Sequence, residues 1–292
     1  MGAAFALLAL LAAASGANAA DAVPACPAST DVMDGWDTRA PPRKIFGNTY
    51  YVGTCGISAI LVTGKRGHVL IDGATEPAGP LIAANIEALG FKLKDVKFIV
   101  NSHEHFDHSA GIAHLQRVTG ATVLAREPAL AMLRSGHSDR NDPQFLELPP
   151  SPPIANIKPL ADGQAVCVGK LALTAHATPG HAPGGTSWTW RSCEDTRCLD
   201  FAYADSVSAI SDKQYRYTDH PDYVTTFRKG LDAMETLPCD VLITPHPLGS
   251  NLFARMEGKA PLAEAGACKR YAETGRNNLQ NRLQDEQDGK AP

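Results

Sequence analysis

The sequence predicts an α/β protein, a four-layer αββα sandwich in which two β-sheets face each other and helices cover both outer faces. Short runs rich in β-branched and aromatic residues, typical of strands, occur in both halves of the 292-residue chain. Helical periodicity follows the strands in each half. A cluster of histidine and acidic residues lies between a strand and a helix, where α/β proteins place their chemistry. The halves show no obvious sequence repeat, so the layers are inferred from the order of the elements.

The first half is expected to contain several strands followed by helices. The expected elements are strands at 45–53, 57–62 and 67–73, a helix at 80–89, a strand at 96–100, a helix from 110, a strand at 121–125 and a short helix at 128–133. The first of these strands contains a turn signal. His68 opens a strand and is expected on the surface. Asp72, at the end of a strand, is either a turn former or an acid that supports the site.

The second half repeats the order of strands and then helices. Residues 136–159 are rich in Pro, Asp and Ser and are expected to form a long loop, as a lid or pocket wall. The expected elements after it are strands at 165–168, 171–175, 186–190 and 201–204, a helix at 221–236, a strand at 240–244 and a polar helical tail from 260.

Residues 1–20 have the pattern of a secretory signal peptide. Phe5–Ala14 is apolar, and Ala17-Asn18-Ala19 forms a small-x-small cleavage site. One feature departs from the usual pattern, because no Lys or Arg precedes the apolar run. We expect cleavage near Ala19 or Ala20 and export to the periplasm.

Composition excludes several kinds of partner. The net charge is −4 and no long charge block occurs, so neither nucleic acid nor a membrane surface is an expected partner. No apolar run outside the N-terminal segment approaches the length of a membrane span. A monomer that acts on a small-molecule substrate is the expectation.

Seven cysteines in an exported chain indicate disulfides. Cys193 and Cys198 flank a turn-like insert between strand-like runs, which favours a hairpin disulfide. The expected pairs are Cys26–Cys55, Cys193–Cys198 and Cys239–Cys268. Cys167, between two valines, is expected as a buried free thiol. The alternative that some cysteines are reduced core residues stays open. No cysteine lies in a ligand-like cluster, so sulfur is not expected in a metal site.

The histidine-rich segment directly after the strand at 96–100 predicts a metal site. His103 and His105 are two residues apart, so they project to the same side of an extended chain. Asp107 and His108 follow where the chain turns toward a helix, and imidazole and carboxylate donors suit zinc. Glu104 alternates with these residues and is expected to face away, toward solvent or a supporting role. One metal cannot easily take all four donors from so short a loop, so two neighbouring metals are expected rather than a solvated polar loop.

Two further histidines are expected to complete this site. His181 lies in the Pro/Gly-rich loop 177–185, and His246 lies between two prolines after the strand at 240–244. Either alone resembles an ordinary turn histidine, but both follow strands. The expected sites are His103, His105 and His181 with one open position, and Asp107, His108 and His246. Two zinc ions about 3.5–4 Å apart share a bridging hydroxide, which implies hydrolysis.

These residues resemble those of a known family. The motif from His103 to His108, the segment Thr178-Pro179-Gly180-His181 and His246 are similar to the metallo-β-lactamases over nearly all of the mature chain. Residues 46–53, 180–188 and 203–206 are similar to the third subclass of class B, closest to the Adelaide imipenemase type. The resemblance implies a single domain over residues 21–292, two Zn²⁺ ions and the metallo-β-lactamase fold.

The resemblance also implies an activity. Such enzymes hydrolyse the β-lactam amide bond of penicillins, cephalosporins and carbapenems with a metal-bridging hydroxide and thereby confer antibiotic resistance. Asp107 would bind metal and orient the water as the catalytic residue. Ser206 stands where the first subclass has a zinc-binding cysteine; with Ser208 it resembles the residues that hold the substrate carboxylate. Gln144 resembles a pocket glutamine of this group.

Two alternatives remain. A glyoxalase-like thioesterase, a lactonase or a phosphodiesterase on the same fold would use a bridging aspartate from a strand end in the second half, where Asp205 is the candidate. We interpret Asp205 as a supporting residue, because His246 already completes the second site. A secreted zinc-binding protein without hydrolytic activity is the other alternative, and the complete ligand set argues against it.

Overall fold

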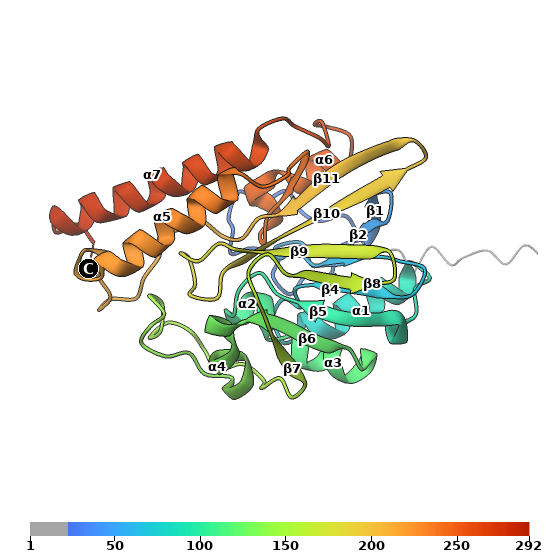
Figure 1. Cartoon of the computed structure of the whole chain (residues 1–292), viewed down its shortest axis with the longest axis horizontal. Helices are drawn as coiled ribbons and strands as arrows, with labels where there is room; N and C mark the ends of the chain where they lie inside the picture. The colour runs from blue at the N-terminus through green and yellow to red at the C-terminus, as the bar shows by residue number, and fades with distance from the viewer. Residues whose placement is uncertain (1–22, 292) are drawn as a thin grey trace, which may run out of the picture.

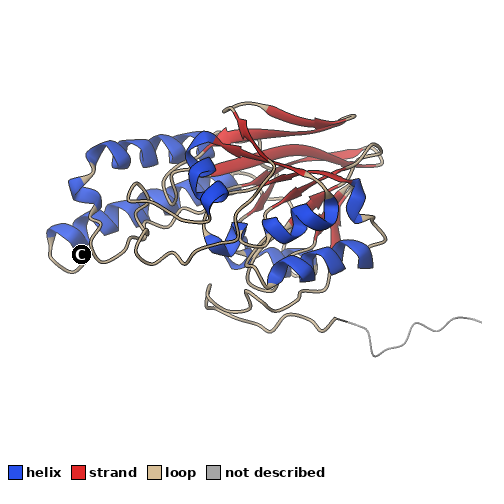
Figure 2. Cartoon of the chain, turned by 90° about the horizontal axis from the view of Figure 1, so that it is seen from below, coloured by secondary structure: helices blue, strands red, loops and turns tan. Residues whose placement is uncertain are grey.

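Two β-sheets pack face to face between helices. The computed structural model describes residues 23–291, so the signal peptide expected at residues 1–20 lies outside the described residues. Helices lie on both outer sides of the paired sheets (Figures 1 and 2). The αββα sandwich predicted from the sequence is therefore confirmed, and the first half of the chain forms one sheet while the second half forms the other.

The first sheet has its seven strands in sequence order, β1 to β7. The pairs from β1 to β4 are antiparallel, and those from β4 to β7 are parallel. The strands are β1 Arg43–Phe46, β2 Thr49–Tyr51, β3 Ile60–Val62, β4 His68–Ile71, β5 Val96–Val100, β6 Thr122–Arg126 and β7 Ile157–Leu160. Parallel strands leave their carboxyl ends at one edge of the sheet, which is where β4 and β5 deliver their polar residues.

The second sheet has the order β12-β11-β10-β9-β8. Its strands pair antiparallel except for β11 and β12, which are parallel. The strands are β8 Ala165–Val168, β9 Leu171–Ala177, β10 Thr186–Glu194, β11 Arg197–Tyr203 and β12 Val241–Ile243. The carboxyl ends of β11 and β12 therefore also lie together.

Helices cover the two outer faces. On the first sheet these are α1 Ala78–Ala88, α3 Ile112–Thr119 and α4 Glu127–Ser135; on the second they are α5 Pro221–Glu235 and α7 Ala267–Gln287 (Figure 1). The shorter helices are η2 Leu93–Asp95, α2 Phe106–Ser109, η3 Tyr217–Asp219, η4 Pro247–Ser250 and α6 Leu252–Met256. In the described part of the chain, no helix has the length and apolar character needed to cross a membrane.

Alternating side chains build three apolar layers. On β5, Val100 belongs to the core between the sheets, while Ile99 packs under the helices of the first sheet. On β11, Phe201 and Tyr203 face the core between the sheets and Ala202 faces α5 and α7. Burying one large apolar side chain stabilises a fold by about 1.5–3 kcal/mol, so this two-residue alternation fixes which face each strand presents.

Two element predictions need correction. The strand expected at 45–53 is a hairpin, in which β1 and β2 pair across Gly47 and Asn48. Gly47 has a φ of 52°, a left-handed conformation that glycine adopts easily. The loop expected at 136–159 ends earlier, because β7 pairs with β6. Pro159 obscured this strand in the sequence, and it is tolerated because β7 is the last strand of its sheet.

Three disulfides form in the pairs that the sequence predicted, and one thiol stays free. They are Cys26–Cys55, Cys193–Cys198 and Cys239–Cys268. The expectation that Cys167 is buried is wrong, because Cys167 is exposed. Its neighbours Val166 and Val168 point into the core between the sheets, so the residue between them points out of the edge strand β8. The expectation that His68 lies on the surface is also wrong. His68 is buried, and its ring packs edge-on against Phe91.

Candidate metal centre

Three loops bring histidines together at one edge of the sandwich. The loop after β5 carries His103 and His105, the loop between β9 and β10 carries His181, and the segment after β12 carries His246. The short helix α2 begins directly after His105 and turns the chain back toward the same point. The sequence predicted this gathering from strand ends that lie far apart in the chain.

His103, His105 and His181 form the first group of potential ligands. Each offers one ring nitrogen, and these three atoms lie within 4.8 Å of one another. Their ring centroids are 4.8–5.0 Å apart. All three side chains are buried. Three imidazoles at this spacing suit zinc with one coordination position left open.

Asp107 and His108 on α2 form a second group beside the first. Their donor atoms and one from His103 also lie within 4.8 Å of one another. His246 completes the cluster, with its Nε2 3.5 Å from Asp107 Oδ2 and its ring 5.0 Å from that of His108. His103 and His108 have ring centroids 4.4 Å apart, so the two groups are immediate neighbours. This geometry fits a dinuclear zinc site.

Carboxylates hold the outer nitrogens of two histidines in the first group. Nδ1 of His103 lies 2.8 Å from Asp205 Oδ1, and Nε2 of His105 lies 2.8 Å from Asp142 Oδ2. A carboxylate behind a metal-binding imidazole fixes the tautomer and the ring orientation. Each of these histidines is thereby left with one nitrogen, Nε2 of His103 and Nδ1 of His105, for the cluster.

Neutral groups hold the outer nitrogens of His181 and His246. Nδ1 of His181 lies 2.9 Å from Ser208 Oγ and 3.0 Å from the Ser208 carbonyl oxygen. Nδ1 of His246 lies 3.2 Å from the carbonyl oxygen of Gly56. In both rings Nε2 remains available. Nε2 of His103 is buried and lacks a hydrogen-bond partner among residues 23–291, whereas the ring nitrogens of His108 face carboxylates, with Nε2 3.1 Å from Asp107 and Nδ1 3.6 Å from Asp72. Buried polar atoms normally have partners, so the orphaned nitrogen of His103 fits a metal ligand.

Asp72 supports the cluster through hydrogen bonds to residues next to the ligands. Its carboxylate accepts hydrogen bonds from the Ser102 backbone at 2.6 Å, the Ser102 hydroxyl at 2.7 Å and the Tyr203 hydroxyl at 2.6 Å. His108 Nδ1 lies 3.6 Å from the same carboxylate. Asp72 has a φ of 64°, which is rare for a residue other than glycine and concentrates at functional sites. The sequence left open whether Asp72 only forms a turn or also supports the site. In the structure Asp72 does both.

The protonation of the buried cluster follows its surroundings. Burial lowers the pKa of His103 well below the usual range, and burial together with His105 lowers that of His181 to about 3. Both imidazoles are therefore neutral, which is the form that binds metal. Burial alone would raise the pKa of Asp107, but attraction to His108 outweighs it and holds that pKa well below its usual range. The same attraction raises the pKa of His108 to about 10 against the effect of burial.

Two of the three predicted substrate contacts lie beside His181. Gln144 Nε2 is 3.5 Å from Nε2 of His181, and Ser208 contacts the far side of the same ring. Ser206 is buried in the segment that follows β11. Glu104 faces away from the ligands as expected, but it is buried rather than exposed, and its Oε1 accepts a 2.9 Å hydrogen bond from the Gly184 backbone. This bond ties the two histidine loops together.

Sequence reasoning missed two residues of the site. Asp142 lies in the long loop, 37 residues from its partner His105, and only its place between the histidine-rich motif and Gln144 could have suggested it. Trp36 on the N-terminal arm has its ring 5.7 Å from that of His246 and 5.8 Å from that of Phe106. No local pattern links this arm to the motif.

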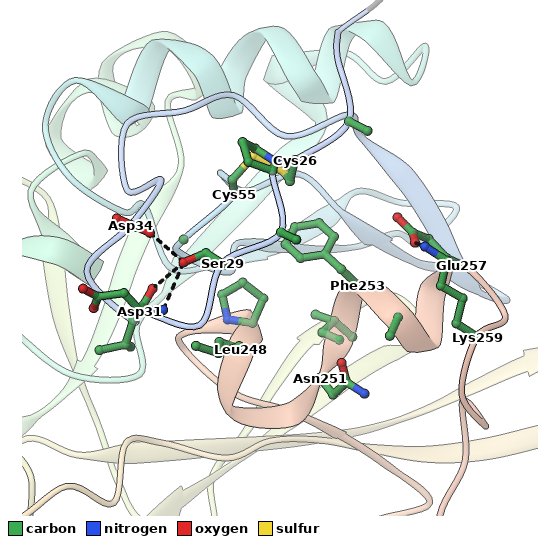
Figure 3. A pocket seen from close by; sticks show the side chains of 18 residues that line it. Cys26, Ser29, Asp31, Asp34, Cys55, Leu248, Asn251, Phe253, Glu257 and Lys259 are labelled. Atoms are coloured by element: carbon green, nitrogen blue, oxygen red, sulfur yellow. Dashed lines mark hydrogen bonds and ion pairs between the residues drawn. A yellow bond between two sulfur atoms is a disulfide. The ribbon is translucent and has the colours of Figure 1, made fainter.

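A separate hollow lies behind the His246 segment. It measures about 380 Å³ and is lined by the N-terminal arm, the Cys26–Cys55 disulfide and residues between Pro247 and Lys259 (Figure 3). None of its lining residues belongs to the two ligand groups. It borders Gly56, whose carbonyl oxygen holds His246, so the arm and its disulfide form the back wall of this side of the site.

Comparison with known proteins agrees with this geometry. Residues 52–246 match the sequence profile of the metallo-beta-lactamase superfamily. The fold is similar to the crystal structure of the metallo-β-lactamase MIM-1 from Novosphingobium pentaromativorans, with 48% identity, coverage of 89% of this chain and 95% of that one, and a TM-score of 0.85. It is also similar to MEM-A1, a subclass B3 metallo-β-lactamase isolated from a soil metagenome library, with 44% identity, coverage of 87% and 99%, and a TM-score of 0.84.

A curated relative is more distant. The N-acyl homoserine lactonase AttM of Azorhizobium caulinodans is 31% identical over an alignment of 164 residues, and the match covers 45% of this chain. The chain spans 58% of the length of that relative. The resemblance to the third subclass stated from sequence motifs is confirmed by the solved structures. The chain belongs to the metallo-β-lactamase superfamily, in its subclass B3.

Proposed function

We propose that this protein hydrolyses the β-lactam amide bond of penicillins, cephalosporins and carbapenems with two zinc ions, and thereby confers resistance to these antibiotics. The observation that carries this proposal is the meeting of two groups of buried ligands, His103 with His105 and His181 beside Asp107 with His108. The similarity to MIM-1 over 95% of that chain supports the same activity.

The ligands divide between two zinc positions. His103, His105 and His181 would hold the first ion, and Asp107, His108 and His246 would hold the second. This division is supported by the spacing of the ligand atoms, because those of His103, His105 and His181 lie within 4.8 Å of one another and His246 lies beside Asp107, with Nε2 3.5 Å from Oδ2. When bound, the zinc ions act as Lewis acids on the lactam carbonyl and lower the pKa of water toward neutrality.

The chain positions the reacting groups around these ions. Asp107 orients the attacking water through its carboxylate, which its low pKa keeps charged. Asp205 keeps the His103 ring in place through Nδ1. Ser206 and Ser208 contact the carboxylate of the substrate, and Gln144 lines the pocket above His181. No side chain needs to act as a nucleophile.

A lactonase or thioesterase is the second candidate, because AttM is a relative. That activity would favour Asp205 as a ligand shared by two metals. Oδ1 of Asp205 instead lies 2.8 Å from Nδ1 of His103, the nitrogen that faces away from the cluster. The position of Asp205 behind His103 therefore favours the β-lactam substrate.

A panel of substrates tests this choice. We expect kcat/KM for a carbapenem, a cephalosporin and a penicillin to exceed that for an acyl homoserine lactone and a glutathione thioester by orders of magnitude. Parallel assays of the zinc-loaded protein with each compound measure the ratio. A lactone or thioester that is turned over faster than every β-lactam would overturn the proposal.

The setting of this activity is the periplasm. We propose that cleavage near Ala19 or Ala20 releases residues 21–292 as one domain that works as a monomer on a small-molecule substrate, without nucleic acid or membrane partners. The three disulfides support an oxidising compartment, because structural disulfides persist there and are rare in the cytosol.

A further inference from the structure

We propose that Asp142 is a positioning residue for His105, and that an Arg140–Asp212 ion pair holds the loop that delivers it. This inference rests on the proposed function only in assigning zinc to His105. It adds a specific role for the loop between α4 and β7, a stretch of chain far from the histidine motif.

The contact between Asp142 and His105 is buried and well formed. Asp142 is 3% exposed and His105 is 2% exposed. Oδ2 of Asp142 lies 2.8 Å from Nε2 of His105, and Oδ1 accepts a 2.8 Å hydrogen bond from the Gln144 backbone. Both carboxylate oxygens are therefore engaged. The charge of Asp142 favours a proton on Nε2, which leaves Nδ1 of His105 as the metal-binding atom.

The loop that carries Asp142 needs an external anchor. Short-range backbone bonds join Asp142 to Asp139 at 3.1 Å and Phe145 to Asp142 at 3.2 Å, but these only close local turns. Loops of this length without regular structure keep a fixed geometry only when other parts of the fold hold them. The position of the carboxylate behind His105 therefore depends on contacts to another segment.

Asp212 supplies that anchor. Its side chain is fully buried and accepts hydrogen bonds from Arg140 Nη1 at 2.6 Å, Arg140 Nη2 at 3.1 Å and the Leu146 backbone at 3.1 Å. Its own backbone N–H donates to the Pro143 carbonyl oxygen at 2.8 Å. Burial alone would raise the pKa of Asp212, but the bonds from Arg140, Gln214 and Leu146 lower it to about 2. Asp212 therefore stays charged. It bonds to Arg140 before Asp142 and to Pro143 and Leu146 after it, so it holds the loop on both sides of Asp142.

One segment consequently supports all three histidines of the first group. Residues 205–212 follow β11 and contain Asp205, which holds His103, and Ser208, which holds His181. The same segment reaches His105 indirectly, because Asp212 fixes the loop of Asp142. The three ring orientations are thus coupled through eight consecutive positions of the chain, although the ligands themselves come from two separate loops.

Zinc affinity tests this role more directly than activity does. Stepwise zinc dissociation constants are measured by competition with a chromophoric chelator. We expect Asp142→Ala to weaken one of the two zinc affinities by about 10–100-fold, the usual effect of removing a group behind a metal ligand, and to leave the other unchanged. Asp142→Asn keeps an acceptor oxygen but loses the charge, so its loss is smaller.

A variant that carries both Arg140→Ala and Asp142→Ala distinguishes an effect of Arg140 through Asp142 from a general loss of structure. Arg140→Ala is expected to weaken the same zinc affinity, and Arg140→Ala with Asp142→Ala is expected to be no weaker than Asp142→Ala alone, because Arg140 acts through Asp142. Arg191→Ala is the matched control: it removes an exposed arginine paired with Asp200 on the distant β10–β11 hairpin and leaves both affinities unchanged.

Two results would overturn the inference. One is parental zinc affinity in Asp142→Ala; the other is an additive loss in the double variant. Failure of the proposed function looks different, since the parent would then bind two zinc ions and turn over no β-lactam. The affinity series still tests the role of Asp142 in that case.

Discussion

Asp107→Asn is expected to lower kcat for a β-lactam by roughly 10²–10⁴-fold, the range typical for loss of a positioned proton-transfer group. The carboxylate lies between two imidazoles, with Oδ2 3.1 Å from His108 Nε2 and 3.5 Å from His246 Nε2. An amide keeps the shape of the side chain but removes its negative charge. The variant therefore loses the charge that the proposed function assigns to zinc binding and to orienting the water. Steady-state hydrolysis of a carbapenem measures the effect.

A second ligand variant and a control accompany this experiment. His181→Ala is expected to lower kcat by orders of magnitude as well, because it removes one of the three nitrogens of the first group. Asp200→Asn is the matched control, since Asp200 is a partly exposed carboxylate paired with Arg191 on the distant hairpin. Its kcat should equal that of the parent. Near-parental turnover by folded Asp107→Asn would refute the proposed role of Asp107.

Trp188→Ala is expected to lower the free energy of unfolding by about 3–5 kcal/mol, the range measured for large aromatic side chains removed from cores. Trp188 is fully buried on β10 in the core between the sheets. Its Nε1 donates a 2.9 Å hydrogen bond to the carbonyl oxygen of Asn101. Asn101 directly precedes the histidine loop, so this indole both fills the core and anchors the start of the site.

Trp188→Phe separates these two contributions. The phenyl ring fills most of the same volume but leaves the Asn101 carbonyl without its donor, so the expected loss is smaller, about 1–3 kcal/mol. Urea unfolding of the zinc-free proteins, followed by circular dichroism, measures both changes. Equal midpoints for Trp188→Ala and the parent would show that the indole does not stabilise the core as described.

Much of the fold and the gathering of the candidate ligands was predictable because the signals are local. The β-branched runs that form β5 and β12 are long enough to indicate buried strands. The spacing of His103, His105 and His108 within six residues needs no knowledge of the fold. His181 and His246 were also predictable, since Pro and Gly around them mark loops directly after strands. The αββα layers followed from the order of elements in each half.

Other features depend on contacts between distant segments. Asp142 lies 2.8 Å from His105 although 37 residues separate them, and the loop that carries it is hydrogen-bonded to Asp212, 70 residues later. Strand β7 contains a proline, so its sequence does not resemble a strand. Its extended conformation comes from pairing with β6. The exposure of Cys167 follows from the place of β8 at the sheet edge, which valine neighbours alone do not reveal.

Hydrolysis of a carbapenem by the purified protein, with and without a zinc chelator, tests the central claim most directly. We predict rapid hydrolysis that the chelator abolishes and that added zinc restores, because zinc held by the histidines and Asp107 would lower the pKa of water toward neutrality and polarise the lactam carbonyl. Absence of hydrolysis by a protein that holds two zinc ions would contradict the claim, and so would hydrolysis that persists after all zinc has been removed.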